Sequence, residues 1–172
     1  MLDSPLKNVM TQGYLYVREE ESAGKALAVM RDMRISCVFV FSGDTPVGIV
    51  TERGVVSKAL GGLDMFTANV TQLMTSPLIT IDQDATISDG CDAMRKHEIR
   101  HLGVVSSKGM LKGVLTPSNI VGVMGTDSFS SSALAQDVMA VSFVLEGPEC
   151  PVDKAAKEMV HKRSCCVLIE DN

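Results

Sequence analysis

The sequence predicts an α/β protein, of α+β character, in which tandem β-α-β-β-α units with small mixed sheets pair pseudo-symmetrically. The first observation is a repeat, because two methionine series recur about 64 residues apart: Met10, Met74 and Met139, and Met30, Met94 and Met159. The second is a turn from a strand through a threonine into a helix, at Thr51 and again at Thr116. The third is a hydrophobic content of 45% over 172 residues, which is enough to bury a core.

The first unit is predicted to span residues 1–66. It begins with a run of strand formers, and Ser22 then provides an N-cap for a helix whose apolar residues fall at helical spacing. A continuous apolar run, short enough for a buried strand, is connected by turn residues to a third strand, which ends at the capping residue Thr51. The predicted strands are residues 14–17, 37–41 and 47–50, and the predicted helices are residues 23–33 and 52–60.

The second unit is predicted to span residues 67–125, in the same order. Thr86 caps its first helix, and Thr116 caps its second, with Pro117 at the first helical position, where a missing N–H costs nothing. A unit this small rarely buries its own apolar face, so we expect the two copies to pack as one module. The predicted strands are residues 78–81, 102–105 and 113–115, and the predicted helices are residues 87–96 and the segment from 117.

Residues 126–172 are predicted to contain a linker and the first half of a third repeat. The serine-rich residues 126–133 have no apolar rhythm, which is typical of a linker. The repeat pattern then resumes, with predicted strands at residues 143–145 and 165–169 and a helix at residues 152–162. The last strand and helix do not follow, which leaves two interpretations: the sequence is the front part of a longer protein, or the half-copy completes an interface in trans.

Charge and composition exclude several classes of partner. A net charge of -5 and a pI of 5.2 oppose binding to nucleic acid or to an anionic membrane surface. With 4% aromatic residues and no Trp, the chain lacks platforms on which bases stack. The sequence has no apolar run of about 20 residues and no signal peptide pattern, so we expect no membrane insertion. Five cysteines outside any C-x-x-C spacing are typical of reduced thiols, which predicts a cytoplasmic protein.

Three sequence features recur at matching places in the copies. Each copy opens with a Val/Leu-Met-Thr-like step at the first methionine series, and an Ile-Arg-His-Leu segment at residues 99–102 precedes a middle strand. The turns that start at Gly48 and Gly113 follow the pattern Gly-hydrophobic-hydrophobic-Thr. Together these features resemble cystathionine-β-synthase (CBS) domains, which pair into a Bateman module. The resemblance covers nearly the whole chain, including the truncated third copy.

The resemblance implies a regulatory module of a signal-transduction protein. Pairs of this kind bind an adenosyl ligand, such as AMP, ADP, ATP or S-adenosylmethionine, in the cleft between the repeats, and they commonly form homodimers. We therefore expect a small-molecule ligand, no required cofactor, a homodimer formed through the pair, and an output domain or partner protein that receives the signal.

The resemblance also implies which residues bind the ligand. In the family turn, Gly-h-h-Thr-x-x-Asp, the Thr hydroxyl reaches a phosphate and the Asp accepts hydrogen bonds from the ribose. Asn119 stands at the Asp position of copy two and keeps one acceptor, so we expect copy two to be the better site. Its expected binding residues are Ser76, Pro77, Leu78, Ile79, His101, Leu102, Gly103, Gly113, Thr116, Ser118 and Asn119.

Copy one is expected to be the weaker site. Gly54 stands at its Asp position and has no side chain to hold a ribose. Arg53 and Arg100 are the cations expected near a phosphate. The residues of this weaker site are Tyr14, Leu15, Gly48, Thr51, Arg53 and Gly54.

Other functions are weighed against this one. Gly54 and Asn119 keep open a dimerisation or interaction scaffold whose degenerate sites bind no ligand. No enzyme is expected, because no catalytic pattern stands out and His101 lacks a nucleophile as partner. No metal site is expected, since the possible ligand sets lack zinc spacing: Cys91 with His97 and His101, and His161 with Cys165 and Cys166. Cys37 and Cys166 share a repeat position, which favours a buried role for both.

Overall fold

The computed structural model describes residues 2–124, 143–164 and 166–171. The predicted linker and the predicted start of the third copy, at residues 126–142, lie outside these described residues. In chain order the elements are η1 (Leu6–Asn8), β1 (Thr11–Gln12), β2 (Tyr16–Arg18), α1 (Ala23–Met33), β3 (Cys37–Ser42), β4 (Thr45–Thr51), α2 (Glu52–Leu60), α3 (Val70–Leu73), β5 (Thr80–Asp82), α4 (Ile87–His97), β6 (Leu102–Val105), β7 (Leu111–Leu115), α5 (Pro117–Met124), β8 (Val144–Glu146), α7 (Val152–His161) and β9 (Val167–Ile169).

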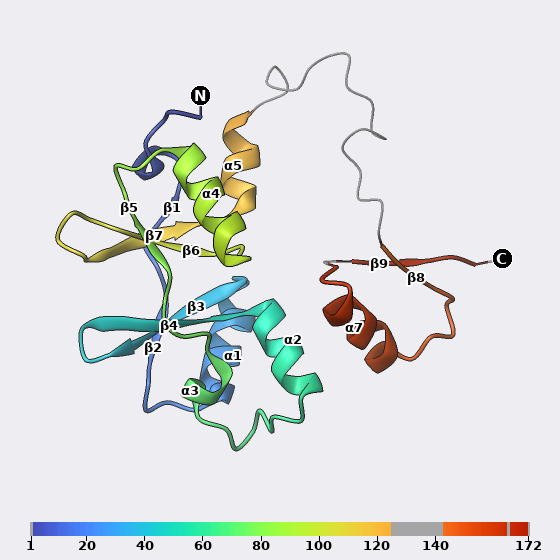
Figure 1. Cartoon of the computed structure of the whole chain (residues 1–172). Coiled ribbons are helices and arrows are strands. Elements are labelled where there is room, and N and C mark those ends of the chain that lie inside the picture. Colours follow the sequence, from blue (N-terminus) through green and yellow to red (C-terminus); the bar gives the residue numbers. More distant parts are fainter. Residues whose placement is uncertain (1, 125–142, 165, 172) are drawn as a thin grey trace, which may run out of the picture.

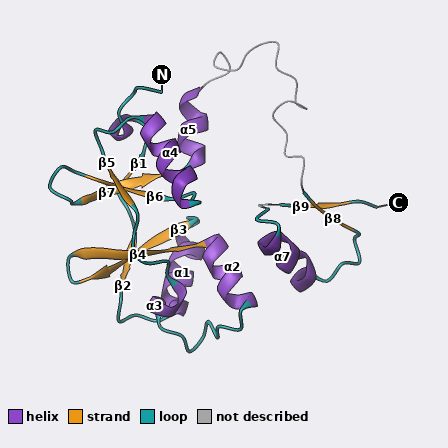
Figure 2. Cartoon of the chain, viewed as in Figure 1, coloured by secondary structure: helices purple, strands orange, loops and turns teal. Residues whose placement is uncertain are grey.

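Two similar bodies, each a small mixed sheet with helices, confirm the predicted fold class (Figure 1 and Figure 2). The first sheet has the order β2-β3-β4 and the second the order β1-β7-β6-β5. In each body a helix crosses between two parallel strands, and a hairpin then adds an antiparallel strand. The register shifts at matching places, between Val40 and Phe41 in β3 and between Val104 and Val105 in β6.

The helices begin where the sequence predicts, because the capping residues are local signals. The side chains of Ser22, Thr51 and Thr86 each accept a hydrogen bond from the backbone amide three residues further on. At Thr86 the side chain of Asp89 bonds back to the cap, which completes a capping box. Within the described part of the chain, no helix has both the length and the apolar content needed to cross a bilayer.

Three helices, α1, α4 and α7, end in the same way. Just beyond each helix a residue adopts the left-handed conformation, at Arg34, Glu98 and Arg163, with φ of 52°, 53° and 52°. The next backbone amide then donates to a methionine carbonyl in the last turn, at 3.0, 3.0 and 2.9 Å. These acceptors are Met30, Met94 and Met159. The second methionine series therefore marks the same helix end in all three segments.

The two sequence repeats exchange their first segments in space. Leu6, at the head of the first repeat, is fully buried in the core of the second body, and its amide donates to the Ala85 carbonyl at 2.8 Å. Reciprocally, Val70 and Leu73 in α3, at the head of the second repeat, are buried in the core of the first body. Each body is thus completed by a segment of the other repeat.

The exchange continues into the sheets. Thr11 in β1 pairs with Val114 in β7, while Thr75 forms the matching bridge with Ile49 in β4. In the second case both hydrogen bonds of the pair are present, at 3.0 and 2.8 Å. The chain therefore crosses from the second body to the first between Gly13 and Tyr16, and it crosses back after Thr75.

Two glycines make these crossings possible. A Cβ on Gly113 would overlap the backbone carbonyl of Thr11, and a Cβ on Gly48 would overlap the side chain of Met74 and the carbonyl of Thr75. The close backbone approach expected at Gly113 therefore exists, but the approaching group is the chain itself.

An apolar cluster joins the two bodies. The first body contributes residues of β3 and β4, and the second contributes residues of β7: Cys37, Phe39, Phe41 and Ile49, and Leu111 and Val114. Cys37 is buried, as predicted. Burial, together with the nearby carboxylate of Glu52, raises the pKa of its thiol to about 11, so it stays protonated at neutral pH.

The C-terminal unit has the order β8-α7-β9, and its two strands are parallel. Its helix α7 packs against α2 of the first body (Figure 1). The prediction of a buried role is wrong for Cys166, which is exposed. Alternation along the strand puts Cys166 on the face that carries Leu168 and its cross-strand neighbour Leu145, and both leucines are about half exposed.

Candidate functional site

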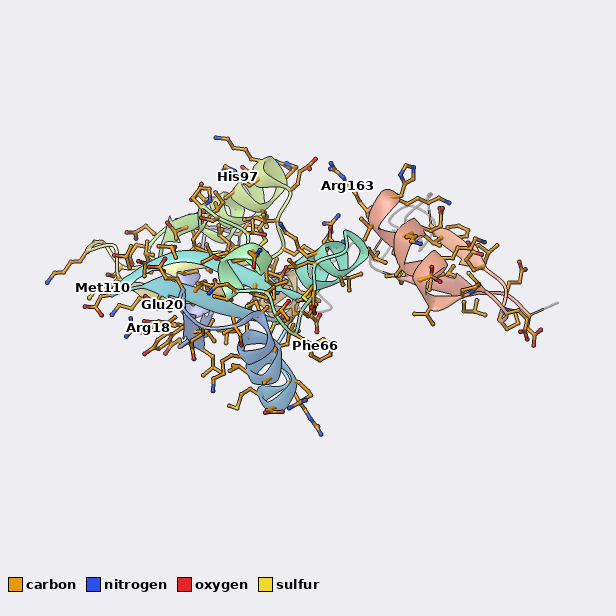
Figure 3. All side chains as sticks on the ribbon, turned by 90° about the horizontal axis from the view of Figure 1, so that it is seen from below. Arg18, Glu20, Phe66, His97, Met110 and Arg163 are labelled. Atoms are coloured by element: carbon orange, nitrogen blue, oxygen red, sulfur yellow. The ribbon has the colours of Figure 1, made fainter. Side chains whose placement is uncertain are left out.

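A cavity of about 630 Å³ lies where the turn from β4 into α2 faces the end of α4. Its wall is drawn from both bodies and from the C-terminal unit. The lining residues are Ile49, Thr51, Arg53, Gly54, Ser57, Thr75, His97, Glu98, Ile99, Arg100, His101 and Arg163. Figure 3 labels His97 on α4 and Arg163 at the end of α7 that is turned toward the two bodies.

Thr51 positions the start of α2 in this wall. Its hydroxyl oxygen accepts a hydrogen bond from the Gly54 amide at 3.2 Å. The Glu52 amide donates to the Ser36 carbonyl, which leaves the Arg53 amide and the Thr51 hydroxyl hydrogen without an acceptor among the described residues. These donors, the positive end of the helix dipole and the Arg53 guanidinium suit an anion.

His101 lines the opposite side, directly before β6. Its Nε2 lies 2.9 Å from the hydroxyl oxygen of Ser36 in the first body. Burial lowers the pKa of His101 from its ordinary value of 6.5, and the neighbouring Arg100 lowers it further. The imidazole is therefore neutral at pH 7 and acts as a hydrogen-bonding group rather than as a charge.

The cavity wall is positively charged overall. Arg53, Arg100 and Arg163 line it, and the carboxylate that stands against them is Glu98. Glu98 is itself paired with Arg163, at 2.5 Å. A concave wall with excess positive charge attracts anions, and guanidinium groups match the oxygens of a phosphate. The cavity is thus suited to a phosphate-bearing ligand.

The equivalent turn of the second body uses its polar groups internally. The Asn119 oxygen accepts hydrogen bonds from the backbone amide and the hydroxyl of Thr116, at 2.9 and 2.8 Å. The Asn119 amide group donates to the Thr11 hydroxyl at 3.1 Å. The two groups expected to bind a phosphate and a ribose here therefore bind each other and the crossing segment.

The other residues of the predicted copy-two site lie in several places. Leu102 is fully buried in the second core, and Ile79 and Leu78 pack against two different apolar clusters. The Ser76 hydroxyl donates to the Val47 carbonyl at 3.0 Å, and the Gly103 amide donates to the Ile79 carbonyl. Pro77 and Ser118 are exposed. His101 lines the cavity at the Thr51 turn instead.

The predicted copy-one site is also divided. Thr51, Arg53 and Gly54 line the cavity together. Tyr14 instead stacks on Phe41, with ring centroids 5.6 Å apart, and lines a separate cavity at the hairpin ends. The carbonyl of the predicted site residue Leu15 accepts a hydrogen bond from Phe39, and Gly48, as described above, contacts the crossing segment.

Sequence reasoning missed four lining residues that matter, Ser57, Thr75, Glu98 and Arg163. Thr75 enters because the chain crosses between the bodies after this residue, which a repeat pattern alone does not show. The match between Arg34, Glu98 and Arg163, each four residues after a methionine of the second series, was the available signal for the last two.

The Ser36 hydroxyl contacts His101, for which the sequence predicts no nucleophile partner. Ser36 does not line the cavity, and among the described residues no third group orients the imidazole, so the pair lacks the arrangement of a catalytic dyad with an oriented base. Within the described ranges no three His, Cys, Asp or Glu side chains gather closely enough to hold a metal ion. Cys165, one of the considered ligands, lies outside them.

A sequence model of the CBS domain matches residues 6–61 and 70–125 of the chain. An uncharacterised protein of Methanocaldococcus jannaschii is 33% identical over 135 residues, which cover 70% of this chain and 32% of that protein. The chain therefore spans about a third of the length of this relative.

Two solved structures share the fold. An uncharacterised conserved protein from Pyrococcus horikoshii aligns with a TM-score of 0.67 and 24% identity, over 73% of this chain and 95% of that one. A CBS domain protein from Pyrobaculum aerophilum, complexed with AMP, aligns with a TM-score of 0.61 and 21% identity, over 67% and 88%. The family model matches both sequence repeats and more than half of the chain, so this chain belongs to the CBS-domain family as a tandem pair.

Proposed function

We propose that the chain is a regulatory CBS pair that binds an adenosyl ligand in the cavity at the Thr51 turn. The observation that carries the proposal is the convergence of an open helix start, Arg53 and Arg100 on one cavity. The AMP held by the Pyrobaculum aerophilum protein makes AMP the first ligand to test. The positive wall favours AMP, ADP or ATP over S-adenosylmethionine, because the sulfonium of the latter is itself a cation.

The Thr51 turn is a better candidate than the Thr116 turn, although the sequence alone favours the reverse. At Thr116 a ligand has to displace hydrogen bonds that Asn119 already makes. At Thr51 the hydrogen-bond donors are free to bind a ligand. The disadvantage of this turn is that Gly54 provides no carboxylate for the ribose. The hydroxyls of Ser57 and Thr75 line the same cavity and are placed to bond a ribose in its stead.

The organisation of the module is part of the proposal. Residues 1–66 and 67–125 are the two CBS domains, and residues 126–172 are a linker and the first half of a third repeat. The parallel β8-α7-β9 order and the shared helix end at Met159 support the third repeat. In a cytoplasmic homodimer, the ligand shifts the packing of the two bodies, and an output domain or partner protein receives that change. No catalytic step is assigned to the chain.

A specific observation also favours the alternative, a dimerisation scaffold without a ligand. The Thr51 turn has Gly54 where the family has a side-chain acceptor. In the Thr116 turn the Asn119 side chain already bonds the start of its own helix. Both turns then serve packing alone. The two functions differ in one measurable respect, which is whether any adenosyl compound binds.

Isothermal titration calorimetry with AMP, ADP, ATP and S-adenosylmethionine tests the proposal on the wild type, Arg53→Gln and Asn119→Ala. We expect a nucleotide to bind, and Arg53→Gln to weaken it about tenfold, since a hydrogen bond to a charged group contributes about 1.5–3 kcal/mol. Asn119→Ala is expected to change affinity less than about threefold. Lys58→Gln is the matched control, because Lys58 is exposed on the same helix and outside the cavity lining.

Two results would contradict this assignment. Weakening by Asn119→Ala with no effect of Arg53→Gln moves the site to the Thr116 turn. Absence of binding at millimolar concentrations, in a protein that stays folded and dimeric, selects the scaffold.

A further inference from the structure

The C-terminal unit contributes a side chain to the cleft of the tandem pair. Arg163 follows α7, at the end of the helix that is turned toward the two bodies (Figure 3), and it lines the same cavity as Thr51, Arg53 and Arg100. The Arg163 amide donates to the Val160 carbonyl and the Ser164 amide to the Met159 carbonyl, so the backbone that carries this side chain is fixed by the helix end. The cavity therefore has three arginines, each from a different part of the fold.

The described lining of this cavity holds fewer carboxylates than arginines. Glu98 is the single acidic side chain in the described lining of the cavity, and it pairs with Arg163 at 2.5 Å. The side chains of Arg163 and Glu98 are 65% and 64% exposed, and an ion pair this exposed contributes little to stability. An incoming anion can therefore replace Glu98 as the partner of Arg163 with little loss of free energy.

The contact between the C-terminal unit and the first body is loosely filled. Helix α7 lies against α2, but a second cavity of about 250 Å³ remains between them. It is lined by Glu52, Arg53, Val56, Arg100, Met159, Val160 and Ser164. This contact is partly unfilled, and the ion pair that joins Arg163 to Glu98 of the second body is exposed, so the C-terminal unit is weakly held. A ligand bound by both sides therefore has a large effect on it.

We infer that Arg163 is a specificity residue for the phosphate chain of the ligand, and that a nucleotide with two or three phosphates thereby holds the C-terminal unit against α2. The inference rests on the proposed function, since it concerns the same cavity. The first phosphate is bound at the Thr51 turn by Arg53 and Arg100, and the further phosphates extend to Arg163. Each added phosphate brings oxygens that a guanidinium can bind in a bidentate manner. A monophosphate does not reach the far wall and leaves the unit loosely held.

Two measurements on the full chain test this inference. Calorimetry compares AMP with ATP, and hydrogen exchange of the α7 backbone amides reports how firmly the unit is held. We expect Arg163→Gln to weaken ATP about tenfold and AMP less than about twofold, because the lost contact is made to the outer phosphates. In the wild type ATP slows exchange in α7 and AMP does not; in Arg163→Gln neither nucleotide does.

Two variants separate binding from folding. Lys162→Gln removes the same charge from the neighbouring exposed residue, which does not line the cavity, and leaves both affinities unchanged. Glu98→Gln breaks the same ion pair but frees Arg163 and removes the negative charge from the wall, so ATP binds several-fold more tightly. If the ion pair had only a structural role, Glu98→Gln and Arg163→Gln would act in the same direction.

The outcomes distinguish the two proposals. If Arg53→Gln weakens both nucleotides but Arg163→Gln weakens neither, the inference is overturned and the adenosyl site stands. Equal weakening of AMP and ATP by Arg163→Gln also overturns it, because Arg163 then contacts the part the two ligands share. If neither nucleotide binds the wild type, both proposals fail together.

Discussion

The turns at Thr51 and at Thr116 occupy equivalent places in the two bodies, and they use their polar groups differently. At Thr51 the residue three positions on is Gly54, which returns only a backbone amide to the cap. At Thr116 it is Asn119, whose side chain closes the turn and also bonds to Thr11. The first turn is left with open donors and faces a cavity, while the second is satisfied by the protein itself.

The difference shows that the same turn can either bond its polar groups internally or leave donors facing a cavity. The polar groups at Thr116 could serve a ribose and a phosphate, but the same groups satisfy the start of α5 and fasten β1. Gly54 in the Thr51 turn lacks the side chain that would contact a ribose in the family pattern. The same lack of a side chain leaves the start of α2 open. The turn that has a side-chain acceptor, Asn119, is therefore the turn whose donors are already bonded.

The largest expected effect is a loss of stability on replacing Gly113, and it should differ from the loss on replacing Gly48, the glycine at the equivalent position. A Cβ on Gly113 would lie 2.1 Å from the backbone carbonyl oxygen of Thr11, whereas a Cβ on Gly48 would lie 2.5 Å from the flexible side chain of Met74 and 2.9 Å from the carbonyl oxygen of Thr75. We expect Gly113→Ala to lower the free energy of unfolding by about 3 kcal/mol, near the upper end for overpacking, and Gly48→Ala by about half as much. Urea denaturation measures both. Equal losses would show that the two crossings are equally rigid.

Asn119→Ala sharpens the comparison by removing the side chain that closes the second turn. We expect a loss of about 1–2 kcal/mol in the free energy of unfolding, because the amide and hydroxyl of Thr116 lose their acceptor. Thermal and urea unfolding measure it, with Lys112→Ala as an exposed control on the strand before this turn. A loss below the experimental error would mean that the turn does not depend on Asn119, and the proposed packing role would be wrong.

Gly54→Asp tests whether the first turn can be made into the family pattern. A carboxylate at this position supplies the ribose acceptor that the turn lacks. We expect affinity for AMP to rise about tenfold, with a stability gain of about 0.5–1 kcal/mol from the removal of a helical glycine. Gly54→Ala is the control, because it removes the same glycine without adding the carboxylate. Equal AMP affinity in the two variants would contradict the ribose role.

The smallest expected effect is a pH dependence of folding stability that comes from His101, which lines the cavity at the Thr51 turn. The folded pKa of His101 is lowered by burial and by Arg100, so on acidification the unfolded chain takes up the proton first. The contribution of neutral His101 to the free energy of unfolding is therefore full above the pKa of the unfolded chain. This contribution is lost progressively as the pH falls below about 6.5. Thermal unfolding at about pH 7.5 and at about pH 5.5 should show a smaller decrease for His101→Gln than for the wild type.

His161→Gln serves as the control for this experiment, because His161 is exposed on α7. Its decrease should match that of the wild type. If His101→Gln and His161→Gln behave alike, the acid sensitivity comes from other groups.

Local features of the fold were predictable from the sequence, because their causes lie within a few residues. Ser22, Thr51 and Thr86 cap helices as expected, since a hydroxyl needs only the amide three residues on. The apolar run at Cys37 forms a strand as its strand-forming residues predict, and this strand is buried. Cys166 has the same local pattern and is exposed, because burial depends on what covers the strand.

The candidate site was less predictable, because it is assembled by the exchange between repeats. The sequence predicts His101 at the turn of its own repeat, but it lines one cavity with Thr51 of the other repeat. The sequence predicts Tyr14 at the Thr51 turn, but it lies in an aromatic cluster elsewhere. Both differences follow from the two crossings between the bodies, whose partners are distant in the sequence and carry no local signal.

The exchanged heads also decide how the gene product can be divided. Residues 1–66 alone lack α3, which completes the core of the first body. They also expose the apolar turn at Leu6, because the core that buries it lies in the second body. Residues 67–124 have the opposite deficit. Neither fragment is a self-sufficient domain, yet each holds the piece that the other lacks, so the two should reassemble when mixed. The same complementarity gives two whole chains a route to exchange heads with one another at high concentration.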